Sequence, residues 1–258
     1  MVSLKRFFET LKQSLMALAF DVFGLFAGSV VVYYLGLFSM APWVIATYPG
    51  ILSARGVIAG LLSGRLSTGL HVGTVEPRFL NNTKSFYLLF KAIVVLTLEA
   101  SVAMSLVAIL FGAFTWGAKA TDLSSILGVI AATMAISLAV ISPVTMFVSF
   151  ISFKHGLDPD IILYPVESTI SDVLITLCYA SILYLFFPFY AFGLYIIIVL
   201  CLILTTSALY FLRRNLKERE FVKTLRESFL TLIFVAFIVN VTGSILERVS
   251  KFIGGRRE

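Results

Sequence analysis

Oxygen-bearing side chains surround one aspartate inside a long apolar stretch. Ser168, Thr169 and Thr176 lie four before, three before and four after Asp172, so all four share one face of an α-helix. Hard cations take oxygen ligands, and Mg²⁺ typically keeps several waters while using one or two carboxylates. The pattern predicts a metal-binding ion path contacted by Asp172, Ser168 and Thr169. The alternative is a structural aspartate bonded to a neighbouring helix.

Other ionisable residues also fall in apolar stretches, where each is a functional hypothesis. They are Asp21, Arg55, Glu99 and Glu167. Asp21 shares a stripe with Gly24 and Gly28, a close-packing signal, so we expect its carboxylate at a helix contact, with contact to the ion as the second choice. Glu167 is expected at the cytoplasmic entrance of its helix. The sequence identifies no partner for Glu99, and Arg55 either pairs with one of these acids or extends to the interface.

Glycine repeats every fourth residue just after Arg55, at Gly56, Gly60 and Gly64. One helix face there is bare backbone. Such a face lets another helix approach closely, or it lets backbone carbonyls face water.

Helices that cross a membrane must position these residues. The chain of 258 residues is 59% hydrophobic and 13% charged, whereas a soluble domain is about 25% charged. This composition excludes a soluble globule, a disordered chain and a disulfide scaffold, and it predicts an all-α polytopic membrane helix bundle. A spanning helix needs about 20 apolar residues. Seven spans are expected, at about 13–36, 41–64, 86–115, 123–150, 164–187, 189–212 and 226–247.

Basic residues mark the cytoplasmic side of a membrane protein. Before the first span, and in the loops after the second, fourth and sixth, they are Lys5, Arg6, Lys12, Arg65, Arg78, Lys84, Lys154, Arg213, Arg214, Lys217, Arg219 and Lys223. We therefore expect a multi-pass cell-membrane protein with a cytoplasmic N-terminus and no nucleic-acid partner. Seven spans put the basic tail after 247 outside. Either this tail is an exception, or the last helix does not fully cross.

Segment 10–20, TLKQSLMALAF, resembles segment 224–234, TLRESFLTLIF. Both begin a predicted helix on the cytoplasmic side. Convergence between two membrane helices explains the likeness, or the seventh span begins a second copy of the unit that starts at span one, as internal repeats do in transporters.

No enzyme motif accompanies these patterns. HExxH, GxSxG and a Walker loop are absent, and Cys178 and Cys201 lie in apolar stretches. We expect neither an enzyme nor an organic cofactor. The rival hypothesis is an intramembrane aspartyl protease or lipid transferase, but a protease needs two carboxylates that share a proton, and Asp21 and Asp172 have no flanking motif for it. A third hypothesis is a non-transporting assembly subunit.

Two segments carry a family resemblance. Residues 49–68, PGILSARGVIAGLLSGRLST, resemble the first signature of MgtE-type magnesium transporters, in particular the solute-carrier branch, at Pro49, Arg55-Gly56 and 65–68. Residues 156–172, GLDPDIILYPVESTISD, resemble the second signature, a Gly-x-Asp-Pro loop followed by a Ser/Thr-rich turn that ends in Asp. The resemblance covers roughly residues 7–187, the five-span unit of that family.

The resemblance implies a transporter of divalent cations, Mg²⁺ first, whose pore aspartate is Asp172. It also implies a homodimer of five-span units around a two-fold axis within the lipid bilayer. Val57 and Ala59 stand where the family has Asn and an acidic residue, so fewer polar ligands line span two. We expect the transport unit at 1–187, an extra crossing helix at 188–214, and at 215–258 a helix like span one of a second repeat, with a basic tail.

Overall fold

The computed structural model describes residues 4–155 and 159–254, and within these ranges the chain forms helices and no strand. The all-α prediction is therefore confirmed. The elements are α1 (Leu4–Asp21), the short 3-10 turn η1 (Val22–Gly24), α2 (Leu25–Tyr33), α3 (Leu35–Phe38), α4 (Pro42–Val72), α5 (Lys84–Thr115), α6 (Asp122–Lys154), α7 (Pro159–Phe186), α8 (Tyr190–Asn215) and α9 (Arg219–Gly254).

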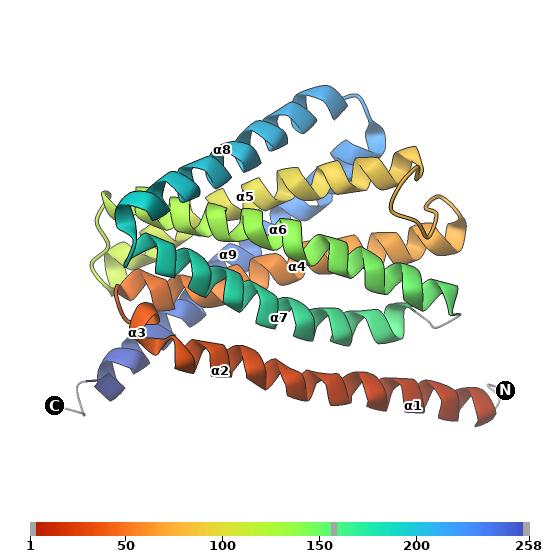
Figure 1. The fold of residues 1–258 in the computed structure, drawn as a ribbon, viewed down its shortest axis with the longest axis horizontal. Helices are drawn as coiled ribbons and strands as arrows, with labels where there is room; N and C mark the ends of the chain where they lie inside the picture. Colours follow the sequence, from red (N-terminus) through yellow and green to blue (C-terminus); the bar gives the residue numbers. More distant parts are fainter. Residues whose placement is uncertain (1–3, 156–158, 255–258) are drawn as a thin grey trace.

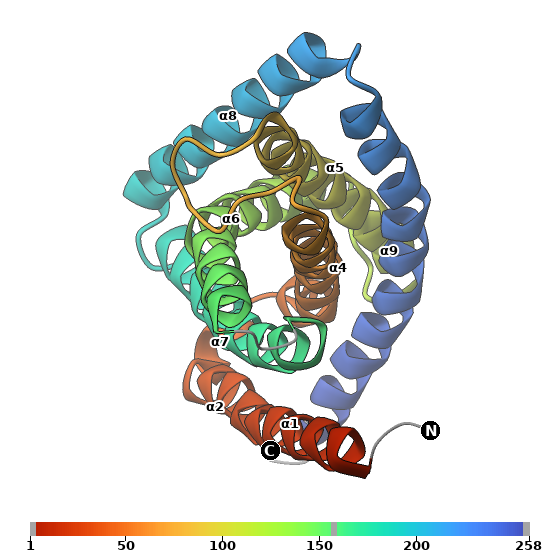
Figure 2. The ribbon, with the colours of Figure 1, turned by 90° about the vertical axis from the view of Figure 1, so that its right-hand side faces the viewer.

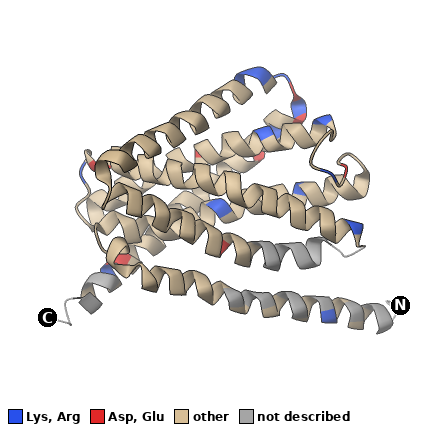
Figure 3. Ribbon diagram, viewed as in Figure 1, with Lys and Arg blue, Asp and Glu red and all other residues tan. Residues whose placement is uncertain are grey.

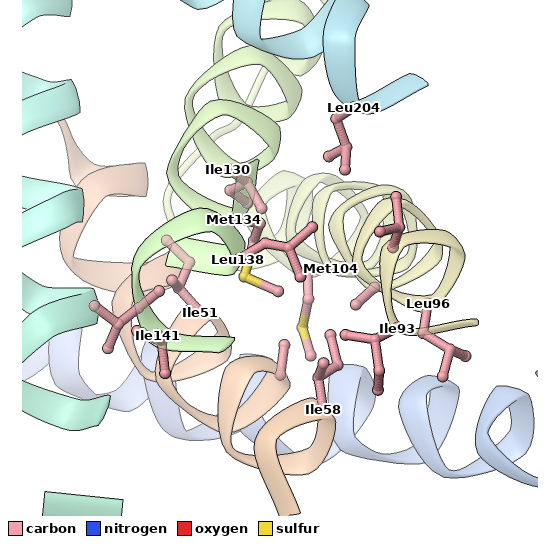
Figure 4. Close-up of a cluster of buried hydrophobic side chains, with 14 of the residues drawn as sticks. Ile51, Ile58, Ile93, Leu96, Met104, Ile130, Met134, Leu138, Ile141 and Leu204 are labelled. Atoms are coloured by element: carbon pink, nitrogen blue, oxygen red, sulfur yellow. The ribbon is translucent and has the colours of Figure 1, made fainter. Parts of the chain in front are cut away.

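Four long helices form the centre of the bundle. Seen along the bundle, α4, α5, α6 and α7 surround one core (Figure 2). Apolar side chains from these helices interlock there, and Leu204 of α8 lies at the edge of the cluster (Figure 4). The cluster includes Ile51, Ile58, Ile93, Leu96, Met104, Ile130, Met134, Leu138 and Ile141. Several buried hydroxyls donate to backbone carbonyls one turn earlier in their own helix, as Ser101 does to Thr97 and Ser149 to Thr145.

The remaining helices wrap this centre. α8 lies along α5 and α6, α9 lies along α4 and α5, and the rod formed by α1, η1 and α2 lies along α7 (Figure 2). α9 and α4 touch backbone to backbone at Gly243, where a Cβ atom would stand 1.8 Å from the carbonyl oxygen of Ala46. Only a glycine fits there, because a side chain would push the helices apart.

Among the residues that the structure describes, six helices are long and apolar enough to cross a membrane: α4, α5, α6, the part of α7 from Ser168, α8, and α9 as far as Val249. The first expected span is the rod of α1, η1 and α2, whose α-helix is interrupted directly after Asp21. About seven spans therefore fit the structure. Pro42 begins α4 and Pro188 separates α7 from α8, as expected, whereas Pro49 and Pro143 lie inside helices without ending them.

The two ends of the bundle carry different connections. The end at which α1 begins also has the turns between α4 and α5 and between α8 and α9, and there α6 ends and α7 begins (Figure 1). The opposite end has α3, the turns between α5 and α6 and between α7 and α8, and the end of α9. α9 runs from one end to the other, which favours the alternative in which the last helix crosses and the basic tail is an exception.

Charged residues gather near the ends of the helices, and few lie along the middle of the bundle (Figure 3). Ion pairs at the end near the N-terminus connect α9 and the turn before it to the central helices. Arg65 of α4 pairs with Glu227 at 2.8 Å, and Lys84 of α5 pairs with Glu218 at 2.7 Å. These ion pairs thus connect α9, the seventh expected span, to α4 and α5, the second and third.

Candidate cation path

The residues expected to contact the ion lie on α7, at graded depth. Thr176 is fully buried and Thr169 nearly so, Asp172 is half-buried, and Ser168 is exposed. Thr176 donates its hydroxyl to the backbone carbonyl of Asp172 at 2.5 Å. This face of α7 therefore carries two buried hydroxyls, at Thr176 and Thr169, beside the half-buried Asp172, and it reaches the surface at Ser168.

Two tyrosines that the sequence analysis did not single out join α7 to α4. The hydroxyls of Tyr48 on α4 and Thr176 on α7 lie 2.8 Å apart. Tyr179 on α7 donates to the carbonyl oxygen of Val44 at 2.9 Å, and its hydroxyl lies 3.2 Å from that of Thr47. A buried phenol needs a polar partner. A tyrosine in an apolar stretch thus indicated a hydrogen bond inside the bundle. The sequence did not show which helix carries the partner.

The pair of Tyr48 and Thr176 sets the register of two antiparallel helices (Figure 1). From that pair, Ser53 is five residues along α4 and Asp172 four residues back along α7. At 1.5 Å per residue, both lie about 6–8 Å nearer the N-terminal end of the bundle, at one level. By the same argument, Gly56 lies level with Ser168.

The glycine-rich face of α4 is uncovered. Gly56 and Gly64 are exposed, and no atom would lie within 4 Å of a Cβ added to either. Gly60, between them, is half-buried. A close approach by another helix, which is one of the two expectations for this repeat, is thus not made at Gly56 or Gly64 by any described residue of this chain. An open strip of backbone on α4 lies at the level of Ser168 on α7.

Arg55 lies on the opposite side of α4, inside the bundle. Its side chain is 1% exposed, and its Nη2 donates to the hydroxyl of Ser142 on α6 at 3.2 Å. The guanidinium therefore does not extend to the interface, which was one of the two expectations for it. Arg55 instead connects α4 to α6 behind the open face.

Asp21 and Glu167 belong to α1 and α7, but their side chains lie outside the described residues. Asp21 ends α1. Gly24 and Gly28 make no close contact, since no atom lies within 4 Å of their Cβ positions. The contact expected from that glycine pair is thus not formed in the part of the chain described.

Glu99 is not brought to Asp172. It lies on α5, which faces α7 across the ring and is flanked by α8 and α9 (Figure 2). Its Oε1 is buried and has no hydrogen-bond partner in the structure as described. The carboxyl group therefore stands apart from the face that carries Ser168 and Thr169.

No resident metal site is found among the side chains that the structure describes. These exclude Asp21 and residues 159–167, and among the rest no group of three or more His, Cys, Asp or Glu could hold a metal ion. His71 and His155 each bond a carbonyl one turn earlier in their own helix, and the cysteines are free. One half-buried carboxyl group with hydroxyls beside it suits a hydrated cation in transit.

Comparison with the sequence models of known protein families gives a match. The sequence model of the family described as "MgtE: Divalent cation transporter" matches residues 48–182, just over half of the chain. The matched stretch runs from Tyr48 through the central helices to Ile182 on α7. It therefore includes both the glycine repeat of α4 and Asp172 of α7. Searches of curated proteins and of solved structures find no match.

Proposed function

Because the chain belongs to the MgtE family of divalent cation transporters, we propose that it carries Mg²⁺ along the face shared by α4 and α7. Asp172 is the ion-contacting carboxylate in this proposal, and Ser168 and Thr169 hold waters of the ion's shell. Asp21 is a second, more distant ion contact. MgtE proteins are transporters and not enzymes, so the hypothesis of an intramembrane protease or lipid transferase is excluded.

One observation carries the proposal: the half-buried Asp172 lies one helical turn from Ser168, which is level with the uncovered Gly56 of α4. A cation that enters there meets one carboxylate, hydroxyl oxygens and bare helix backbone at Gly56. Mg²⁺ gives up its waters reluctantly and uses few protein ligands, so a sparsely liganded path fits it better than Ca²⁺, which takes six to eight oxygens.

A homodimer would complete the path on the side where Gly56 and Gly64 of α4 are uncovered. A two-fold axis next to the open face brings a second Asp172 opposite the first, and the two carboxylates balance a 2+ charge while leaving room for waters. The basic turns at the end near the N-terminus favour a cell-membrane protein with that end in the cytoplasm.

Division of the chain follows from the same proposal. Residues 1–187 form the transport unit, 188–214 form an extra crossing helix, and 215–258 begin a second repeat. α1 and α9 start at the same end of the bundle, which supports the repeat. They pack differently, because α1 lies on α7 whereas α9 lies on α4 and α5.

Metal flux into proteoliposomes tests the function. Purified chain in sealed vesicles is expected to admit Mg²⁺ in preference to Mn²⁺, Co²⁺ and Ca²⁺, measured with a trapped indicator for each ion. Vesicles without protein give the rate at which each ion leaks through the lipid bilayer. Absence of flux for all four ions in well-folded, sealed preparations would favour a non-transporting assembly subunit instead.

A further inference from the structure

A basic hollow lies outside the cation path, at the turn from α8 into α9. Four residues, Lys217, Arg219, Lys223 and Arg226, line a hollow of about 670 Å³. Leu216, Val222, Glu227 and Leu230 complete its lining. Residues 219, 223, 226 and 230 recur at helical spacing, so they share the outer face of α9, away from the central helices.

The positive charge of this hollow is not cancelled by its acidic neighbours. Glu218 pairs with Lys84 at 2.7 Å, and Glu227 pairs with Arg65 at 2.8 Å, so both acids are held by other helices. Lys223 lies 3.7 Å from Glu227, at the long limit of an ion pair. Lys217, Arg219 and Arg226 have no ion pair among the residues that the structure describes.

Apolar side chains stand beside these charges. Leu216 is 58% exposed and Leu230 is 59% exposed, and Val222 is also exposed. Further along α9, Phe229 and Phe234 are exposed on the way toward the middle of the bundle. The surface thus changes from basic to apolar along the helix, as a lipid does from headgroup to acyl chain.

We propose that this hollow binds the headgroup of an anionic phospholipid from the adjacent leaflet. Its phosphate oxygens accept hydrogen bonds from Lys223 and Arg226, with Lys217 and Arg219 around them, and its acyl chains lie on the exposed face of α9. Basic clusters next to a spanning helix attract anionic lipids. A soluble phosphate would satisfy the charges but would leave Leu216, Val222 and Leu230 exposed to water.

Lipid binding here would also tighten the contact between α9 and α4. Glu227 lies between Arg65 and Lys223. A phosphate that engages Lys223 leaves Glu227 to Arg65 alone. The bound lipid is therefore expected to raise the unfolding temperature of the whole chain, independently of cation transport.

Thermal unfolding of the full chain in detergent, with added lipid, tests the site. Phosphatidylglycerol is expected to raise the melting temperature more than phosphatidylcholine with the same chains. Near a membrane surface each basic residue contributes about a fivefold gain in affinity for anionic lipid. The double variant Lys223→Gln/Arg226→Gln should therefore bind phosphatidylglycerol about 25-fold more weakly, as native mass spectrometry measures.

A matched control removes two charges at the same end of the bundle. Lys12 on α1 and Lys154 on α6 are exposed and do not line the hollow, so Lys12→Gln/Lys154→Gln should bind as tightly as the wild type. Equal loss in both double variants, or equal binding of the two lipids by the wild type, would overturn the proposal. So would displacement of the lipid by glycerol phosphate at matched concentration, because the hollow would then accept a soluble phosphate.

Discussion

At the scale of single residues, polar groups inside the bundle divide into those that have partners and those that do not. Tyr48, Tyr179 and Arg55 each bond to another helix. Glu99 Oε1 is buried and has no hydrogen-bond partner among the described residues. The hydrogen-bonded residues hold helices together. Burying a polar group without a partner, as at Glu99, lowers the free energy of unfolding, so such a residue is a candidate for a functional role.

Tyr48→Phe removes the hydroxyl that lies 2.8 Å from that of Thr176. Interhelical hydrogen bonds in membrane proteins contribute about 0.6 kcal/mol on average, up to about 1.7. The variant is expected to unfold about 1 kcal/mol more easily in detergent. Tyr195→Phe is the control, since Tyr195 is exposed on α8. An equal effect of the two variants would show that the bond between α4 and α7 contributes nothing.

Glu99→Leu replaces a carboxyl group whose Oε1 is buried and unpartnered with an apolar side chain of similar size. Since the cost of desolvating that group disappears, the free energy of unfolding is expected to rise by about 1–3 kcal/mol. Thermal unfolding and Mg²⁺ flux are measured on the same preparation. A less stable variant would mean that Glu99 has a stabilising role that this account does not include.

At the scale of the elements, apolar length was the strongest signal in the sequence. It predicted every long helix, because backbone groups in lipid must be satisfied within the segment. The break after Asp21 was not predictable, since residues 22–24 are as apolar as their neighbours. Pairings such as Tyr179 with Val44 also escaped, because they join residues 135 apart in the chain. Helical spacing alone was enough to place Asp172 on one face of a helix with Ser168, Thr169 and Thr176.

Two glycines of the bundle differ in how closely other helices approach them. At Gly243 of α9, a Cβ would lie 1.8 Å from the carbonyl oxygen of Ala46, whereas at Gly64 of α4 nothing lies within 4 Å. Gly243→Ala is therefore expected to destabilise the chain by about 1–3 kcal/mol or more. Gly64→Ala should be neutral or stabilise it by up to about 1 kcal/mol, because alanine is the better helix former.

Thermal unfolding in detergent compares the two glycine variants directly. If both substitutions leave stability unchanged, then α9 does not touch α4 where the structure places the contact.

At the scale of the whole molecule, the open face of α4 and the half-buried Asp172 together predict a second copy of the chain. Ser168 is exposed one turn from Asp172, whereas Ser171 is buried in the bundle. With Cys178 and Cys201 replaced by alanine, Ser168→Cys should crosslink two chains through a short bifunctional reagent, and Ser171→Cys should not. Crosslinking at neither site, together with a monomeric mass in active preparations, would contradict the homodimer.

The central claim is that the carboxylate of Asp172 contacts the transported cation, and flux of Mg²⁺ through the Asp172→Asn variant tests it most directly. Asparagine keeps the size and the helix but removes the charge. Glu99→Gln makes the same change at a carboxyl group away from the path. The account predicts that Asp172→Asn abolishes flux in a protein that remains inserted and folded, while Glu99→Gln transports like the wild type. Wild-type flux through a well-folded Asp172→Asn variant would contradict it.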